Sequence, residues 1–332
     1  FEQNGIAFVD KLNNGRNPIR PGELTIEMVV RAGSVTGRGF NSLLMIHDGS
    51  DHRQLIVGQW KSALIVMNGN DYDHTKRIPR LSVKDTFSTE KVRFLTISAG
   101  IGRTQVYVDG ALAAADKDWQ LIVPNQGSPL RLVLGNSVKG KNSWDGEIFG
   151  LAIYGKVLSA DVIRRNHDRW RQTLAFTPDG IEGLTLLYKF HELADNEIPD
   201  RSGGDHPLKL PSRPVVLEKE ILSAPWHHFN LNRSFLSDAT INVIGFIPLG
   251  FGMFGWLKRI RRLTGNQRFW STLLICSILS LVIEIVQAWI PTRSSSLMDL
   301  IMNTIGAWIG IWLFVGVNKA GRLNPCKIRR NQ

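Results

Sequence analysis

The stretch that decides the fold of the last third of the chain is SLVIEIVQAWIPTRSSSLMDLIMNTIGAWIG, residues 280–310. Two apolar runs flank a short polar loop, and the runs themselves contain Glu284, Gln287, Asp299 and Asn303. Polar and ionisable side chains are costly within an apolar span, so they usually have partners or a function there. The pattern therefore predicts a pair of membrane helices with a polar site close to their connecting loop.

Three apolar runs occupy this part of the sequence, at about residues 241–257, 269–290 and 300–317. Each approaches the roughly 20 residues that a helix needs to cross a bilayer. Buried helices of a soluble protein are the alternative, but three such runs with so little charge favour membrane spans. Tryptophans near the ends of the runs fit the interfacial aromatic residues of membrane proteins: Trp256, Trp270 and Trp289.

The positive charge is concentrated in the same region. The 332-residue chain has a formal net charge of +11. Residues 1–221 contain 28 Lys and Arg against 26 Asp and Glu, whereas residues 222–332 contain 12 against 3. This distribution is typical of basic flanks on membrane spans and argues against a nucleic-acid partner.

The basic residues also predict the orientation of the spans. They cluster between the first and second runs and after the third, which by the positive-inside rule places both stretches in the cytoplasm. We therefore expect a multi-pass membrane protein, with a cytoplasmic C-terminus and everything before the first run outside. An export signal or a further span is expected upstream of Phe1.

The N-terminal part has a different pattern, with short alternating runs separated by Gly, Asn, Asp and Pro. Many short strands at this spacing predict an all-β sandwich or barrel. One amphipathic helix is expected at residues 159–174, with Ser159 as its cap and Asp161 in its first turn. The strands are expected at residues 5–9, 24–31, 42–47, 54–59, 62–68, 92–98, 105–108, 130–134 and 146–154.

Three phrases in this part resemble the concanavalin A-like, laminin-G-like jelly-roll superfamily: ELTIEMVVRAG at 23–33, TQVYVDGALAA at 104–114 and WDGEIFGLAIYGKVLSADVIRRN at 144–166. A fourth, residues 183–211, resembles the opening strand of such domains although it follows the closing helix. It either adds a strand back onto the sandwich, as in a circular permutation, or forms an independent segment. The resemblance implies a jelly-roll sandwich over residues 1–211 that binds carbohydrate.

The sequence favours binding over catalysis in this domain. Glucanases of the superfamily use clustered carboxylates on one strand, and no alternating run of acids is present here. Exposed tryptophans could stack on a sugar face, although core packing is the commoner role: Trp60, Trp119 and Trp144. Calcium is the one cofactor with candidate ligands, and solvated loop acids are the alternative interpretation of the same residues: Asp48, Asp51, Asp71 and Asp73.

A linker is expected at residues 212–229, followed by a membrane domain at 230–332. NVIGFIPLGF at 242–251, the basic loop after it and residues 283–310 resemble the VanZ-like membrane family. Seven residues fall on positions of the family's pattern: Glu284, Gln287, Arg293, Asp299, Asn303, Gly306 and Gly310. Ser296 stands where the family commonly has a second loop acid, which weakens any mechanism that needs paired loop carboxylates.

The polar positions of this resemblance share helical faces, Glu284 with Gln287 and Asp299 with Asn303, and the pair Asp238 and Asn242 repeats the spacing. Two interpretations stay open. The residues form a polar clasp between helices, or they bind an anionic head group or lipid-linked precursor, with Arg293 on the phosphate and Glu284 or Asp299 as acid or base. The GxxxG pair Gly306 and Gly310 predicts close helix packing.

The sequence thus predicts a membrane-anchored cell-envelope protein that binds glycan or another envelope ligand. Resemblance to the VanZ-like family implies a link to glycopeptide-antibiotic tolerance without a settled activity. The expected partners are the lipid bilayer and either cell-wall glycan or a lipid-linked precursor. A membrane enzyme or transporter centred on Glu284, Arg293 and Asp299 is the alternative, and a structural adhesin-like module is a third.

Overall fold

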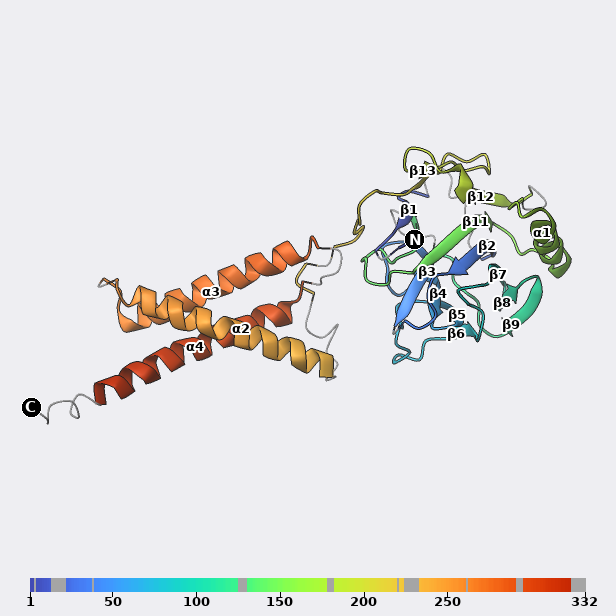
Figure 1. Cartoon of the computed structure of the whole chain (residues 1–332). Helices are drawn as coiled ribbons and strands as arrows, with labels where there is room; N and C mark the ends of the chain where they lie inside the picture. The colour runs from blue at the N-terminus through green and yellow to red at the C-terminus, as the bar shows by residue number, and fades with distance from the viewer. Residues whose placement is uncertain are drawn as a thin grey trace, which may run out of the picture. The chain divides into compact units, whose positions relative to one another are not determined.

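A computed structural model describes residues 1–2, 4–12, 22–37, 39–124, 130–177, 182–219, 221–223, 233–260, 262–290 and 295–323. The chain divides into two compact units, Phe1–Leu217 and Glu218–Gln332. The β-strands lie in the first unit and three long helices lie in the second (Figure 1).

The first unit is a sandwich of two antiparallel sheets, which confirms the predicted all-β jelly-roll class. One sheet has the strand order β13-β14-β1-β10-β3-β4-β5-β6, and the other has the order β12-β11-β2-β7-β8-β9. The strands are β1 (Ala7–Val9), β2 (Leu24–Ala32), β3 (Phe40–His47), β4 (Leu55–Trp60), β5 (Ala63–Asn68), β6 (Arg80–Val83), β7 (Arg93–Gly100), β8 (Arg103–Val108), β9 (Ala111–Asp116), β10 (Arg131–Leu134), β11 (Gly146–Tyr154), β12 (Leu184–Lys189), β13 (Glu197–Ile198) and β14 (Leu208–Lys209).

Alternation along the strands builds the core between the sheets. In β2, Leu24, Ile26 and Met28 are fully buried in this core, while Thr25 and Glu27 project to the opposite face. That opposite face is covered by α1 (Ala160–Thr173), whose Ile163 packs into a second apolar cluster with strand residues. Both faces of this sheet are therefore buried around β2.

The structure corrects one detail of the helix prediction. Ser159 stands at the N-cap position of α1 with an extended backbone, but its side chain makes no capping hydrogen bond. Its hydroxyl therefore does not satisfy the first amides of the helix, as capping would require. Asp161 lies in the first turn as expected, where a negative charge favours the helix dipole.

The segment that follows α1 returns to the sandwich. β12 pairs antiparallel with β11, so the second sheet gains an edge strand from residues after the closing helix. β14 pairs with β1 and β13 pairs with β14, which extends the first sheet. The interpretation of residues 183–211 as an addition to the sandwich is thereby confirmed.

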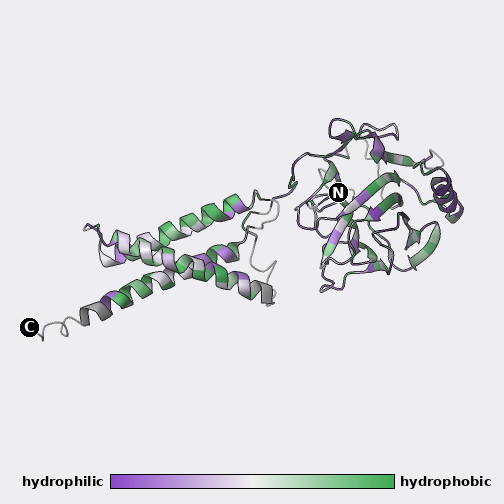
Figure 2. Ribbon diagram, in the orientation of Figure 1, coloured by the Kyte–Doolittle hydropathy of each residue, from purple (hydrophilic) through white to green (hydrophobic). Residues whose placement is uncertain are grey.

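The second unit consists of α2 (Arg233–Leu257), α3 (Gly265–Gln287) and α4 (Leu297–Leu323). Each contains a stretch long and apolar enough to cross a membrane: Leu236–Leu257, Gly265–Gln287 and Leu297–Lys319. Apolar residues run along all three helices in Figure 2. A capping box between Thr264 and Gln267 fixes the start of α3.

Small residues bring α2 and α4 together. A Cβ added to Gly306 would overlap the carbonyl oxygen of Val243, and one added to Gly310 would overlap that of Ile247. Gly250 of α2 lies equally close to the backbone of Ala307. The backbones of the two helices are therefore in direct contact, an arrangement that larger residues at these positions would prevent.

Candidate functional site

The polar side chains of the helical unit gather at the end of the bundle where α2 starts, α3 ends and α4 starts. Glu284 lies in the last turn of α3 and is only 2% exposed. Its Oε2 accepts a hydrogen bond of 2.8 Å from the backbone amide of Ser296, and the Ser295 side chain also hydrogen-bonds to it. Glu284 therefore holds the residues that lead into α4.

A second contact joins α2 to α4. Asn242 Nδ2 donates a hydrogen bond of 2.8 Å to Oδ1 of Asp299, in the first turn of α4. Asp238 and Glu284 both lie close enough to Asp299 for their charges to interact. Three carboxyl groups from three helices thus share this end of the bundle.

One turn further into α4, the contacts join α3 and α4. Asn303, 4% exposed, donates from Nδ2 to Ser280 Oγ at 2.9 Å. Ser277 and Thr304 share a hydrogen bond of 3.1 Å between their hydroxyls. Asn303 Oδ1 is buried and accepts no hydrogen bond from any described residue. An unpaired buried acceptor is unusual in a native structure.

A short segment before the bundle covers the same end. Leu222 N donates to Ser295 Oγ at 3.0 Å, and Ser223 N donates to the Ser295 carbonyl at 3.0 Å. The Leu297 amide in turn donates to the Ser223 carbonyl at 3.2 Å. Residues 221–223 therefore lie beside residues 295–297 and help to fix the loop that Glu284 binds.

The remaining predicted residues of this site have different positions. Gln287 is half-buried at the end of α3. Arg293 lies outside the described residues, so its predicted pairing with Glu284 or Asp299 stays a prediction. Gly306 and Gly310 belong to the contact of α2 with α4, two and three turns from Asp299. Sequence reasoning did not find Ser280 and Ser295, because small hydroxyl residues carry no distinctive pattern.

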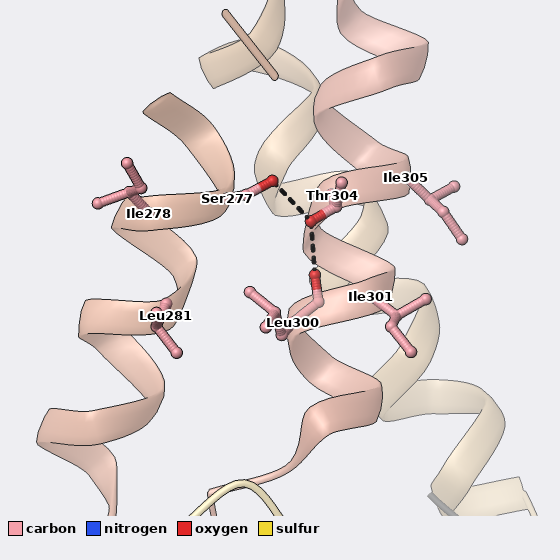
Figure 3. A pocket seen from close by; sticks show the side chains of 7 residues that line it. All are labelled: Ser277, Ile278, Leu281, Leu300, Ile301, Thr304 and Ile305. Atoms are coloured by element: carbon pink, nitrogen blue, oxygen red, sulfur yellow. Dashed lines mark hydrogen bonds between the residues drawn. The ribbon is translucent and has the colours of Figure 1, made fainter. Parts of the chain in front are cut away.

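A groove of about 420 Å³ runs between α3 and α4 (Figure 3). Its hydroxyls are already engaged, since Ser277 bonds to Thr304 and Thr304 donates to the Leu300 carbonyl at 2.8 Å. No ionisable side chain lines it, which makes it an apolar surface rather than a reactive site. The lining residues are Ser277, Ile278, Leu281, Leu300, Ile301, Thr304 and Ile305.

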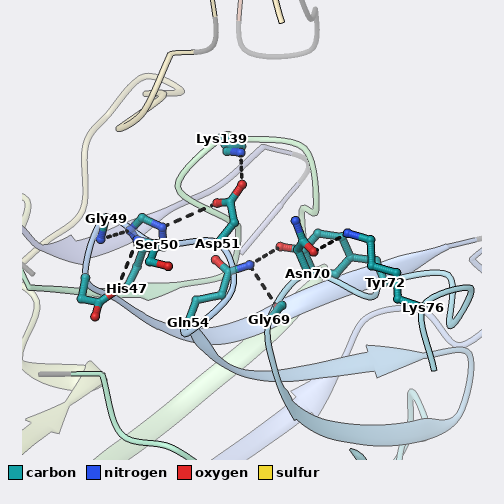
Figure 4. A network of polar contacts seen from close by, with 11 residues as sticks. His47, Gly49, Ser50, Asp51, Gln54, Gly69, Asn70, Tyr72, Lys76 and Lys139 are labelled. Carbon is teal, nitrogen blue, oxygen red and sulfur yellow. Dashed lines mark hydrogen bonds and ion pairs between the residues drawn. The ribbon is translucent and has the colours of Figure 1, made fainter. Parts of the chain in front are cut away.

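In the β unit, three loops meet through a polar network (Figure 4). Asp51 pairs with His47 at 3.8 Å and with Lys139 at 2.5 Å. The hydrogen bond from His47 is the main cause that lowers the pKa of Asp51, and Lys139 lowers it further although burial opposes both. Gln54 Nε2 donates to the Gly69 carbonyl and to the Tyr72 hydroxyl, both at 3.1 Å. We call residues 48–54, 69–79 and 137–142 the loop surface.

The other acidic candidates of the loop surface are also held by protein donors. Asp71 is fully buried, which by itself would raise its pKa, but backbone amides of Lys76 and Ile78 donate to it and lower the pKa overall. Asp48 accepts from Arg53 at 3.1 Å, and Asp73 accepts from the hydroxyl of Thr75 at 2.9 Å.

These contacts bear on the calcium hypothesis. The four aspartates are oriented by cations and amides of the protein rather than converging on one point. Within the described ranges, no group of three or more His, Cys, Asp or Glu side chains could hold a metal ion. Each of these acids is in contact with donors of the protein itself.

The tryptophans considered for sugar stacking differ in exposure. Trp144 is fully buried, and its Nε1 donates to Gln59 Oε1 at 2.7 Å, so core packing rather than sugar stacking is its role. Trp119 is half-buried against the sandwich core, and Trp60 is 39% exposed at the end of β4. Only Trp60 presents a substantial part of its ring to a ligand.

Sequence reasoning missed one buried acid. Glu27 is fully buried beneath α1, where Asn166 donates to both of its oxygens, at 2.9 and 3.1 Å, and the Tyr154 hydroxyl donates at 3.2 Å. Burial raises its pKa to about 7, although both hydrogen bonds oppose the shift. Through Asn166 it joins α1 to the sheet.

Each part of the chain matches a family model. Residues 9–164 match the concanavalin A-like lectin/glucanases superfamily, and residues 200–318 match VanZ/LLP1. Both predicted resemblances are confirmed. No curated protein has a significantly similar sequence.

Several solved structures share features of the β unit at low similarity. A carbohydrate-binding candidate from Bacteroides ovatus is 17% identical with a TM-score of 0.45, and the match covers 64% of this chain and 60% of that one. The CBM40 of a Ruminococcus gnavus IT-sialidase, bound to α2,3-sialyllactose, is 14% identical with a TM-score of 0.38, covering 48% and 90%. Domain 4 of AbnA, a GH43 arabinanase from Geobacillus stearothermophilus in complex with arabinotriose, is 15% identical with a TM-score of 0.35, covering 44% and 67%. Similarities this low carry no argument about what the present chain binds.

Proposed function

We propose that this chain, which joins a concanavalin A-like domain to a VanZ-like domain, is a cell-envelope protein anchored in the bacterial plasma membrane whose β unit binds glycan. The observation that carries the proposal is the fusion itself. A superfamily of lectins and glucanases matches residues 9–164, and three helices long enough to span a membrane follow within the VanZ/LLP1 match at 200–318. The bundle would then hold a glycan-binding domain at the membrane surface.

Binding rather than hydrolysis is supported by the acids of the β unit. Glycosidases need two carboxyl groups that flank one bond, with room for substrate between them. Here Glu27 is buried under α1, while Asp51 and Asp71 are engaged by internal donors. These acids are unavailable to a glycosidic bond.

The loop surface is the proposed place of binding. Its internal acids fix three loops, and the exposed side chains on it include the cations Arg77 and Lys141 and the imidazole of His52. Sugars are recognised through hydrogen bonds from such groups, and anionic glycans also through charge. An anionic cell-wall glycan therefore suits this surface better than a neutral one.

The charge of the bundle supports the outward position of the β unit. Lys258, Arg259, Arg268 and Lys319 lie at one end of the helices, and Asp238, Glu284 and Asp299 lie at the other. By the positive-inside rule the basic end faces the cytoplasm. The chain enters α2 from the acidic end, so the β unit would lie on the extracytoplasmic side.

The test uses the full chain in lipid nanodiscs, applied to glycan arrays and to purified cell-wall material. A double variant His52→Ala with Arg77→Ala is expected to weaken retention by roughly ten-fold or more, because hydrogen bonds to a charged ligand are lost. The matched control, Lys84→Ala with Lys117→Ala, changes two cations that are exposed outside the loop surface. Failure of the wild-type protein to bind any glycan, with or without calcium, would refute the proposal.

A membrane enzyme or transporter for a lipid-linked envelope precursor is the second candidate. It is favoured by the three carboxyl groups at the acidic end and by the unpaired Oδ1 of Asn303. Against it, Glu284, Asp299 and Asn303 each bond to another segment, which is what a polar clasp requires. We therefore propose the clasp as their main role.

One variant separates the two roles. Glu284→Gln keeps the size of the side chain but removes its charge. If the site is catalytic, glycopeptide tolerance of the host is lost while the amount of protein in the membrane stays unchanged. If Glu284 is part of a clasp, tolerance falls only as far as the amount of protein falls. Arg293→Ala extends the same comparison to the loop.

A further inference from the structure

A second pocket lies at the basic end of the bundle, away from the polar clasp. It has a cavity of about 200 Å³ and takes side chains from all three helices and from one residue beside them: Phe254 from α2, Lys258 just after α2, Arg268 from α3, and Phe314, Asn318 and Lys319 from α4. We call it the basic pocket. It is smaller than the roughly 300–1,000 Å³ of sites for drug-sized ligands, so it suits a compact group.

Among the described residues, no acidic side chain lines the basic pocket. Lys258, Arg268 and Lys319 place three cations around one cavity. The sequence contains no Asp or Glu between Asp238 and Glu284, and none after Asp299. No acidic side chain from these segments can therefore neutralise the three cations, and an anionic ligand would satisfy them.

Arg268 supplies an independent sign of a missing acceptor. Its Nε is buried and donates to no described residue. A guanidinium N–H that is removed from water without an acceptor is costly, and natural proteins rarely tolerate it. Phosphate oxygens are the preferred partners of an arginine whose donors are arranged as a fork.

Contacts within the protein position Lys258 at the pocket. Lys258 Nζ donates to Asn318 Oδ1 at 3.0 Å and lies 5.4 Å from the centroid of the Phe314 ring. Phe314 is itself packed edge-on against Phe251 and Phe254, at 5.1 and 5.6 Å between centroids. The pocket thus combines ordered cations with aromatic walls, which suits a ligand with a charged head and an apolar body.

The basic pocket lies at the level of the helices where the head groups of a bilayer are expected. The apolar stretches end at Leu257 and Lys319 and begin at Gly265, so the basic pocket lies where the spans leave the membrane. Trp256 and Trp270, both more than half exposed, mark the same level as interfacial aromatic residues do. Basic pockets between membrane helices are suited to anionic lipid head groups.

We propose that the basic pocket binds the phosphate group of an anionic phospholipid from the surrounding bilayer. Arg268 and Lys319 contact the phosphate, Lys258 adds charge, and Phe254 and Phe314 contact the glycerol and the first methylenes of the acyl chains. This site is independent of the glycan proposed for the β unit. It makes the helical unit sensitive to the lipid composition of the leaflet at its basic end.

The test is native mass spectrometry of the full chain in detergent, titrated separately with phosphatidylglycerol, phosphatidylcholine and inorganic phosphate. The wild-type protein is expected to bind phosphatidylglycerol roughly ten-fold more tightly than phosphatidylcholine, and Arg268→Gln should remove that preference. Lys319→Gln, at an exposed position, is a second variant in case Arg268→Gln misfolds. Arg259→Gln removes an exposed cation at the same end but outside the pocket and should keep the preference.

Each outcome decides the proposal. Loss of the preference in Arg268→Gln or Lys319→Gln but not in Arg259→Gln supports it. Equal binding of both lipids by the wild-type protein overturns it, and so does an equal effect of all three variants, which would indicate attraction by general charge. If inorganic phosphate binds in an Arg268-dependent manner while phosphatidylglycerol does not, the site takes a soluble phosphate and the lipid assignment is wrong.

Discussion

Replacing Glu27 with glutamine should make the β unit more stable at neutral and alkaline pH and leave it little changed in acid. Glu27 is fully buried between β2 and α1, and burial raises the pKa of its carboxyl group from 4.5 to about 7. In the unfolded chain the same group ionises near its ordinary value. Between these two pH values the unfolded chain releases a proton that the folded chain retains, so stability falls as the pH rises.

The size of the effect follows from the two pKa values. At roughly 1.4 kcal/mol per pKa unit, a rise from 4.5 to about 7 corresponds to about 3 kcal/mol in the free energy of unfolding above pH 7. Below pH 4.5 both states hold the proton and the difference vanishes. Glutamine stays neutral throughout, keeps an oxygen for Asn166 and can donate from its nitrogen to the Tyr154 hydroxyl.

The assay is urea unfolding of the fragment Phe1–Leu217, which contains every strand of both sheets, followed by intrinsic tryptophan fluorescence, to which the buried Trp144 contributes, between pH 4 and pH 8. The free-energy difference between Glu27→Gln and wild type should grow by about 3 kcal/mol over this range. Glu147→Gln is the control, since Glu147 is exposed and pairs with Arg31 on the surface. A difference that stays constant with pH would refute the argument that Glu27 is buried in its neutral form.

The helix contact, the loop network and the aspartates give three further predictions. Gly306→Leu should destabilise the helical unit by roughly 1–3 kcal/mol, because the new side chain would overlap the Val243 carbonyl. Unfolding in mixed micelles measures this loss. Gly316→Leu is the control, since a Cβ at Gly316 meets open space and should cause no loss. Asp51→Asn should destabilise the β unit by roughly 1–2 kcal/mol at pH 7. Because the folded-state pKa of Asp51 is depressed, this loss should be present above pH 3.8 and shrink in stronger acid; a loss independent of pH would contradict the pairing with His47 and Lys139. A calcium chelator should leave the melting temperature of the β unit unchanged, because the loop aspartates already accept from protein donors; a drop would reveal a metal.

The β fold could be predicted where alternation is strong. Residues 24–31 and 146–154 were expected as strands and form β2 and β11. β9 (Ala111–Asp116) was not among the expected strands, because its alanines carry no alternation and have weak strand propensity, although the phrase at 104–114 that resembles the superfamily covers its start. β6 (Arg80–Val83) was not expected either, and only Leu81 of its four residues is buried.

The burial of particular side chains was less accessible to sequence reasoning. Glu27 alternates with apolar residues, a pattern that normally places an acid in water, and only the packing of α1 over that face reverses the outcome. Trp144 is buried in the core, where its indole N–H is satisfied by Gln59, a residue 85 positions away in the sequence. Contacts at such separations follow from topology, which local patterns do not contain.

At the candidate site, the sequence predicted polar residues on shared helix faces but not what most of them contact. Asp299 was paired by spacing with Asn303, and Asn242 with Asp238, whereas the structure joins Asn242 to Asp299 across α2 and α4. Glu284 accepts a hydrogen bond from the backbone amide of Ser296. The loop before α4 is also held by Ser223, which precedes the bundle in the sequence. Backbone partners and preceding segments leave no residue-type signal, so neither could be predicted.

The central claim is that a glycan-binding β unit is held on the extracytoplasmic side of the membrane by the helical unit. Its most direct test is the retention of labelled cell-wall glycan by membrane vesicles of defined orientation that contain the full chain. Right-side-out vesicles are expected to retain the glycan, and the His52→Ala, Arg77→Ala variant should reduce that retention. Inside-out vesicles should retain none until they are opened. Binding by intact inside-out vesicles, or by neither kind, would contradict the claim.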